Sequence, residues 1–140
     1  MVRTMARAID VANYLAWLAE SDEDNDLLTH LRIQKLLYYA QGWSLGTSGN
    51  ALFPEKIIAY PNGPVVHSVY GQLKHFGRDS IHAKACPGDL DKLTTEEADL
   101  VARVYNTYKA HSASSLVRMT HSESPWLDAR GDTGWAPERF

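Results

Sequence analysis

The sequence predicts a mainly α-helical fold in one compact domain. With 140 residues, 44% of them hydrophobic and 22% charged, the chain has the size and composition of one globular domain with a proper core. Apolar residues recur at helical spacing in several separate stretches, whereas only residues 56–60 read as a strand. We therefore expect about five to six helices, with at most a short strand or hairpin near residues 56–60.

The first helix is expected from about Asp10 to Glu20, with Asp10 as its N-cap. An acidic run from Ser21 to Asp26 ends it, and we expect this run to be a solvated linker. The apolar stripe of the helix consists of Ile9, Ala12, Leu15, Ala16, Leu18 and Ala19.

A second helix is expected from the cap Thr29 through Leu45, with Gly46 and Gly49 as stop signals. It is apolar on two sides. One face carries Ile33, Leu36, Leu37, Ala40 and Trp43, and the opposite side carries Leu31 and Tyr38 beside Gln34 and Lys35. Such a helix is either central to the fold or packed on one side and open to a partner on the other. The pattern favours the central helix, and the second interpretation stays open.

The middle of the chain predicts a strand, a turn and a helix. Residues 56–60 form the candidate strand, and the tetrapeptide at 61–64 is a tight turn. Pro64 is then expected to be the first residue of a third helix that runs through Phe76 to a stop at Gly77. The stretch from Ile81 to Asp91 reads as a loop.

A capping box of Thr94 and Glu97 opens the fourth helix. A short fifth helix is expected over residues 113–120, and a final turn from Ser124 carries Trp126. The predicted apolar stripe of the fourth helix is Ala98, Val101, Ala102, Tyr105 and Tyr108.

Charge and cysteine content favour a cytoplasmic protein. The formal net charge of -3 gives no overall attraction to nucleic acid or to anionic membranes. Cys86 is the one cysteine, so no intramolecular disulfide can form, which fits a reducing cytosol. No stretch is apolar enough for a signal peptide or a membrane span.

Two patterns imitate catalytic or calcium sites. Residues 42–46 match the nucleophile elbow of serine hydrolases, but Ser44 continues a helical period with no sheet around it. The acidic run imitates an EF-hand loop, yet Leu27 replaces its glycine and Ile33 its glutamate.

The six histidines show no zinc-binding spacing, and the least unlikely ligand is His121 beside Glu123. No glycine-rich phosphate loop is present either. We expect no enzyme activity, no metal and no cofactor.

A helix-turn-helix interpretation deserves comparison, because His30, Arg32, Gln34 and Lys35 open the second helix with groups that contact DNA. The preceding acidic connection would repel a duplex, and the helix is too apolar for a groove. A nucleic-acid partner is therefore not expected.

Three stretches together resemble a known family. They are residues 28–43 (LTHLRIQKLLYYAQGW), residues 59–70 (AYPNGPVV continuing to Val69 and Tyr70), and Leu116 with residues 120–126 (THSESPW). In this order, after an opening at residues 9–14, they resemble the Panacea domain family of SocA-like antitoxins, also called phage-associated or GepA-type proteins. The resemblance covers a core of about residues 8–130 in one domain over 1–140, with 131–140 as a possible tail.

The resemblance implies a mainly helical antitoxin that neutralises a cognate protein toxin by direct binding. One branch of the family is instead a proteolytic adaptor that presents its toxin to a ClpXP-type protease, and a DNA-binding transcriptional regulator is the other alternative. Some members carry a DNA-binding segment before the domain. Because this chain begins almost at the domain, we expect neither that segment nor repression of its own operon.

The motif residues divide into two expected roles. Low entropic cost makes tyrosines good partner-binding groups, and the expected partner-binding residues are Gln34, Lys35, Tyr38, Tyr39, Tyr60 and Tyr70. The loops 21–26 and 81–91 are the alternative location of specificity for the toxin. The expected structural residues of the family motifs are Thr29, Trp43, Gly63, Pro64, Val65, His121, Pro125 and Trp126.

Overall fold

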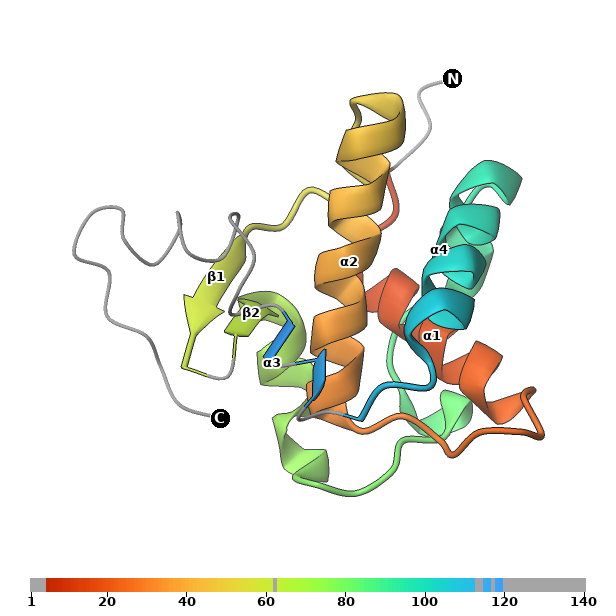
Figure 1. The fold of residues 1–140 in the computed structure, drawn as a ribbon, viewed down its shortest axis with the longest axis vertical. Helices are drawn as coiled ribbons and strands as arrows, with labels where there is room; N and C mark the ends of the chain where they lie inside the picture. Colours follow the sequence, from red (N-terminus) through yellow and green to blue (C-terminus); the bar gives the residue numbers. More distant parts are fainter. Residues whose placement is uncertain (1–4, 62, 113–114, 117, 120–140) are drawn as a thin grey trace.

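The structure, a computed structural model, describes residues 5–61, 63–112, 115–116 and 118–119. Figure 1 shows its main elements. They are, in chain order, α1 (Ala8–Glu20), α2 (His30–Ser48), β1 (Ile57–Tyr60), β2 (Gly63–Val66), α3 (His67–Leu73) and α4 (Thr95–Tyr108). The prediction of a mainly helical fold with a short hairpin is confirmed.

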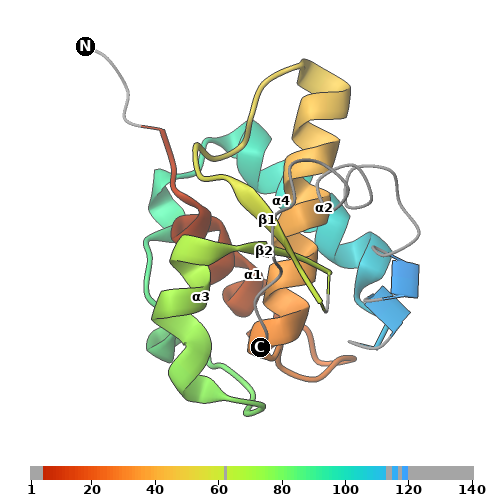
Figure 2. The same cartoon turned by 90° about the vertical axis from the view of Figure 1, so that its left-hand side faces the viewer.

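Helix α2 is the centre of the fold. It contacts α1, α3, α4 and β2, with α1 and α4 on one side and the hairpin and α3 on the other (Figures 1 and 2). Its side chains Ile33, Leu36, Leu37 and Ala40 are fully buried. The two-sided apolar pattern of the sequence therefore marks a helix with neighbours on both sides, as the central-helix interpretation predicted.

Helix α1 begins two residues before the predicted start. Asp10 is not the N-cap: it lies in the first turn, where its carboxylate accepts hydrogen bonds from the backbone N–H groups of Arg7 (2.9 Å) and Asp89 (2.8 Å). An acidic side chain at the third helical position can reach back to the N–H of the cap residue. The carboxylate still stabilises the helix start, from inside it.

Thr29 caps α2 as predicted, with its hydroxyl accepting from the Arg32 N–H at 3.4 Å. The predicted end near Leu45 is wrong, since the helix continues through Gly46 to Ser48. Gly49 ends the helix because it adopts a left-handed conformation with φ 75°. Gly46 is exposed and helical, and a helix tolerates such a glycine at a small cost in stability.

Strands β1 and β2 form an antiparallel hairpin in which Ile57 pairs with Val66 and Tyr60 with Gly63. The prediction that Pro64 starts the third helix is wrong, because Pro64 lies in β2 opposite Ala59 and α3 begins at His67. A proline is accepted in an edge strand, where no neighbouring strand needs its missing N–H. Helix α3 ends at Leu73 and continues as a 3₁₀ turn, Lys74–Phe76.

Helix α4 begins with the predicted capping box, in which Thr94 accepts from the Glu97 N–H (3.1 Å) and Glu97 from the Thr94 N–H (2.8 Å). Its buried face is rotated from the predicted stripe. Ala98 and Ala102 are only half-buried, because the larger apolar side chains of the helix turn inward. The buried residues are Leu100, Val101, Val104 and Tyr105.

The described part of the chain contains four α-helices, fewer than the five to six predicted. The difference lies after α4. The expected fifth helix, 113–120, includes residues 113, 114, 117 and 120, which lie outside the described residues. The turn from Ser124 and the tail 131–140 lie outside them too.

The predicted loop 81–91 contains two 3₁₀ turns, Ala83–Ala85 and Leu90–Lys92, and is fastened to α1. The Asn13 amide donates to the carbonyl oxygens of Ala83 (3.2 Å) and Cys86 (2.9 Å) and accepts from the Leu90 N–H (3.2 Å). This segment therefore packs as part of the domain rather than as a free loop.

The acidic segment 21–26 was expected to be solvated, and at Asp22 this is wrong. The Asp22 carboxylate accepts from Lys109 Nζ (3.1 Å) and from the Tyr105 hydroxyl (2.9 Å). Hydrogen bonds from Lys109, the Asp24 backbone and Tyr105 lower the pKa of Asp22 to about 2. Asp22 therefore ties the end of α1 to the end of α4.

None of the helices in the described ranges has the length and apolar content needed to cross a lipid bilayer.

Candidate functional site

Motif residues that are far apart in sequence meet where α2 packs against the hairpin and α3. We call this cluster the α2–hairpin junction and define it as His30, Gln34, Lys35, Tyr60 and Tyr70. It lies on the side of α2 that Figure 2 turns toward the viewer. Polar and aromatic groups dominate it, whereas the buried residues of α1 are mostly aliphatic.

Gln34 is the polar centre of the junction, and its side chain is 0% exposed. Its amide oxygen accepts from the Val66 N–H at 2.9 Å, and its amide nitrogen donates to the Val66 carbonyl at 3.3 Å. This two-way bond resembles the pairing that another strand would give to Val66. Gln34 thus satisfies both backbone groups at the point where β2 ends and α3 begins.

Lys35 is also 0% exposed, and its Nζ donates to the Pro64 carbonyl oxygen at 3.0 Å. Burial lowers the pKa of Lys35 to about 7, because a low-polarity surrounding disfavours the charged ammonium. Two neighbouring residues of α2 therefore hold β2 at two carbonyls that are two residues apart, Lys35 at Pro64 and Gln34 at Val66.

Aromatic and imidazole rings complete the junction. His30 Nε2 lies 3.0 Å from Gln34 Nε2, and the His30 ring packs 5.4 Å from the Tyr70 ring. The Tyr60 hydroxyl lies 2.6 Å from His67 Nδ1. Because Tyr60 is fully buried, this bond gives its polar tip a partner inside the fold.

Acidification is expected to weaken the fold through His30. Burial, with a smaller effect of Lys35, lowers the pKa of His30 to about 4. The pKa of a histidine in an unfolded chain is about 6.5. Between these two pKa values the unfolded chain binds one more proton than the folded chain. The free energy of unfolding therefore falls as the pH falls, by at most about 1.4 kcal/mol per pH unit.

Urea denaturation at pH 7 and pH 5 measures this effect. We expect His30→Gln to lose less stability than the parent over that interval, even if it is less stable at pH 7. Equal losses in the two proteins would show that His30 does not carry the pH dependence.

A second aromatic group lies between α2 and α4. Tyr39 stacks on Tyr108 with centroids 4.1 Å apart, and Trp43 meets the Tyr108 ring edge-on at 6.1 Å. Tyr38 contacts Tyr39 at 5.3 Å. These rings join the central helix to α4, which places Trp43 at the edge of the core.

The six residues expected to bind a partner do not form an exposed surface. Tyr70 is half-buried, and the other five are buried: Gln34, Lys35, Tyr38, Tyr39 and Tyr60. Their burial does not provide the exposed surface that partner binding would use, and the binding role itself stays a prediction. Polar aromatic residues suit an interface or a core equally, and in this fold their contacts lie within the domain.

Most of the motif residues expected to be structural have local roles. Thr29 caps α2, Gly63 has the positive φ of 106° that the hairpin turn requires, and Pro64 and Val65 are buried in β2. Trp43 packs at the edge of the core, as described above, and His121, Pro125 and Trp126 lie outside the described residues.

The residues that suggested a helix-turn-helix point into the fold. His30, Gln34 and Lys35 are buried, and the Arg32 guanidinium donates to the Lys109 carbonyl at 2.7 Å. These contacts hold the start of α2 against the hairpin and the end of α4, so the four side chains are not arranged as a groove-reading surface.

Residues 42–46, which match the nucleophile-elbow pattern of serine hydrolases, are helical. Ser44 lies inside α2, and its hydroxyl donates to the Asn50 carbonyl at 2.7 Å. Within the described ranges, no three His, Cys, Asp or Glu side chains gather as they would around a metal ion. His121 and Glu123 are not among the described residues.

Sequence reasoning missed an aromatic pair on the outer side of α1. The Tyr14 and Trp17 rings stack with centroids 5.8 Å apart, and Trp17 is 45% exposed. Trp17 lies off the apolar stripe of its helix and outside the family motifs. A large ring on the polar side of an amphipathic helix is the signal that would have identified it.

Comparison with known proteins gives one family. The sequence matches the family described as "Antitoxin SocA-like, Panacea domain" over residues 33–127, from α2 past α4. No match was found among curated proteins or among solved structures. Because the matched stretch spans more than half of the chain and contains most of the α2–hairpin junction, the chain belongs to the SocA-like, Panacea domain antitoxin family.

Proposed function

We propose that this protein is the antitoxin of a toxin–antitoxin pair and that it neutralises a cognate protein toxin by binding it directly. The observation that carries the proposal is the family match over residues 33–127. The protein acts stoichiometrically in this proposal, without a catalytic step and without a cofactor.

The geometry supports a binding role over a catalytic one. The polar residues that draw attention in the sequence, Gln34, Lys35 and Ser44, are each hydrogen-bonded to backbone groups of the domain. Catalytic groups usually lie in a cleft where they can reach a substrate. The exposed Trp17, by contrast, has the character of an interface side chain.

A growth experiment tests the proposal. The gene beside this one is induced in a host with and without the antitoxin gene, each from an unrelated promoter, so that repression of the natural promoter cannot produce rescue. We expect growth to stop without this protein and to recover when it is supplied in excess. A harmless neighbouring gene, or arrest that excess protein does not relieve, would contradict the proposal.

The same experiment in a host lacking ClpXP-type proteases separates direct neutralisation from the adaptor mechanism. Direct binding predicts unchanged rescue and an unchanged amount of toxin. Rescue that disappears with the protease, together with a longer toxin lifetime, would favour the adaptor instead.

A further inference from the structure

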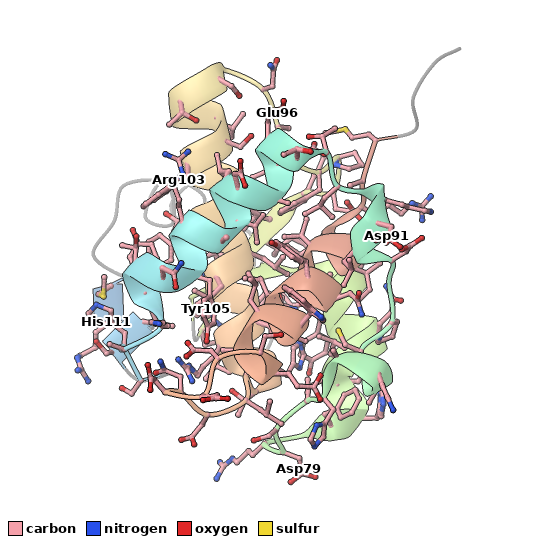
Figure 3. The ribbon with its side chains drawn as sticks, turned by 90° about the vertical axis from the view of Figure 1, so that its right-hand side faces the viewer. Asp79, Asp91, Glu96, Arg103, Tyr105 and His111 are labelled. Atoms are coloured by element: carbon pink, nitrogen blue, oxygen red, sulfur yellow. The ribbon has the colours of Figure 1, made fainter. Side chains whose placement is uncertain are left out.

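The side of the molecule opposite the hairpin presents an open face made by α1, α4 and the segment 83–92. Figure 3 views this face, on which α1 runs between α4 and the segment that carries Asp91. Near the middle of α1 the exposed Trp17 ring stacks on the half-buried Tyr14 ring. In the described ranges, just three large apolar side chains are exposed, and the others, Met5 and Leu45, lie elsewhere in the chain.

The aromatic pair is suited to binding. Stacking on Tyr14 at an interplanar angle of 12° restrains the Trp17 ring before any partner arrives. Little side-chain entropy is then lost on association, and tryptophan is among the residues that contribute most at interfaces.

A shallow hollow of about 530 Å³ lies along the outer side of α4, lined by Glu96, Asp99, Ala102, Arg103 and Asn106. Helices α1 and α4 pack side by side (Figure 3), which brings the hollow next to the aromatic pair. Asp99, which lines the hollow, is near enough to Tyr14 for its charge to add to the effect of burial in raising the pKa of Tyr14. Hollow and rings therefore form one surface, which we call the α1–α4 face and define by Tyr14, Trp17 and these five α4 residues.

The charge on and around this face is mainly negative. Six exposed acidic side chains lie there against three basic ones: the acidic residues are Glu23, Asp24, Asp89, Asp91, Glu96 and Asp99, and the basic residues are Lys84, Lys92 and Arg103. Exposed basic residues Lys56, Lys74 and Arg78 belong instead to the flanks of β1 and α3, across α2 (Figure 1). An acidic face with an aromatic centre complements a basic surface.

We propose that the α1–α4 face binds the partner toxin and that it receives an arginine-bearing, basic surface of that toxin. This rests on the proposed function and adds the place and the chemistry of recognition. Arginine fits both features: its planar guanidinium stacks on an indole ring and pairs with carboxylates through two parallel hydrogen bonds. A second copy of this chain would bring the same acidic face and is disfavoured by like charge.

The test measures affinity for the purified product of the neighbouring gene by calorimetry, using full-length variants. Trp17→Ala is expected to weaken binding by at least about 30-fold, the effect of losing a strong interface residue, while Trp17→Phe keeps most of the affinity. Leu45→Ala removes an equally exposed apolar side chain (49%) from α2 and is expected to change affinity by less than about 3-fold.

Salt dependence tests the charge complementarity. The association rate of the parent is expected to fall as sodium chloride is raised from 50 to 500 mM, and the double variant Glu96→Gln, Asp99→Asn is expected to show a weaker fall.

The outcomes separate this inference from the proposed function. If the parent binds the toxin tightly and the Trp17→Ala and charge variants bind equally well, the α1–α4 face is not the interface, while the antitoxin function stands. If the parent binds no toxin, the proposed function itself fails. A change of oligomeric state in Trp17→Ala, with toxin affinity unchanged, would assign the face to a second copy of the chain and overturn the inference.

Discussion

Gln34→Ala is expected to lower the free energy of unfolding by about 3–5 kcal/mol. The substitution removes a side chain that bonds both backbone groups of Val66 and contacts His30 Nε2. The Val66 N–H would then be buried without a partner, at a cost of about 1–3 kcal/mol, and the shortened side chain would leave a cavity in the fully buried junction. Urea denaturation followed by circular dichroism measures the change.

Gln72→Ala is the matched control. Gln72 is exposed on α3, and its amide makes one long hydrogen bond, 3.4 Å, to the Ser68 carbonyl. We expect a change within about 0.5 kcal/mol. If the two glutamine variants were equally stable, the α2–hairpin junction would not depend on Gln34 in the way the contacts indicate.

Gly88→Ala is expected to cost at least about 2 kcal/mol, because two independent effects act at this position. Gly88 has a φ of 106°, a conformation that side chains rarely adopt. A Cβ atom would also overlap the backbone carbonyl of Ile9 in α1. Since both obstacles are backbone, a rotamer change cannot relieve them, and the segment 83–92 must move away from α1.

Gly46→Ala is the opposite control. Gly46 is exposed and helical, and nothing lies within 4 Å of the position that its Cβ would occupy. Alanine is expected to raise the stability of α2 by about 0.5–1 kcal/mol. Thermal denaturation should therefore move the two glycine variants in opposite directions from the parent, and a Gly88→Ala protein as stable as the parent would contradict the packing of this segment on α1.

Local signals in the sequence predicted the helices well. The caps at Thr29 and at Thr94 with Glu97 depend on a few neighbouring residues and appear in the structure as predicted, and of the two predicted stop signals Gly49 is the one that ends α2. The strand position of Pro64 was not predictable in this way. It depends on Lys35, 29 residues away, which donates to the Pro64 carbonyl and helps fix the second strand.

The sequence indicated which residues belong to the candidate site, but it did not indicate that most of them are buried. The motif stretches do meet, in the α2–hairpin junction, yet Tyr60 and Lys35 are buried there. Whether a tyrosine or lysine finds its partner inside the fold depends on contacts between distant segments, which composition and periodicity do not contain. The exposure of Trp17 was not predicted either, because it depends on which side of α1 packs against the rest of the domain.

In the proposed function, the α2–hairpin junction and the α1–α4 face have different tasks. The α2–hairpin junction stabilises the domain from inside, whereas the α1–α4 face offers exposed rings and charges. A buried scaffold and an open recognition surface can change independently of each other.

The most direct test of the central claim is to titrate the purified toxin, the product of the neighbouring gene, with this protein in the absence of any protease and to measure toxin activity and complex mass together. The account predicts that activity falls in proportion to the complex formed and is lost when the toxin is saturated. A toxin that stays fully active when saturated, or that forms no complex at all, would contradict neutralisation by direct binding.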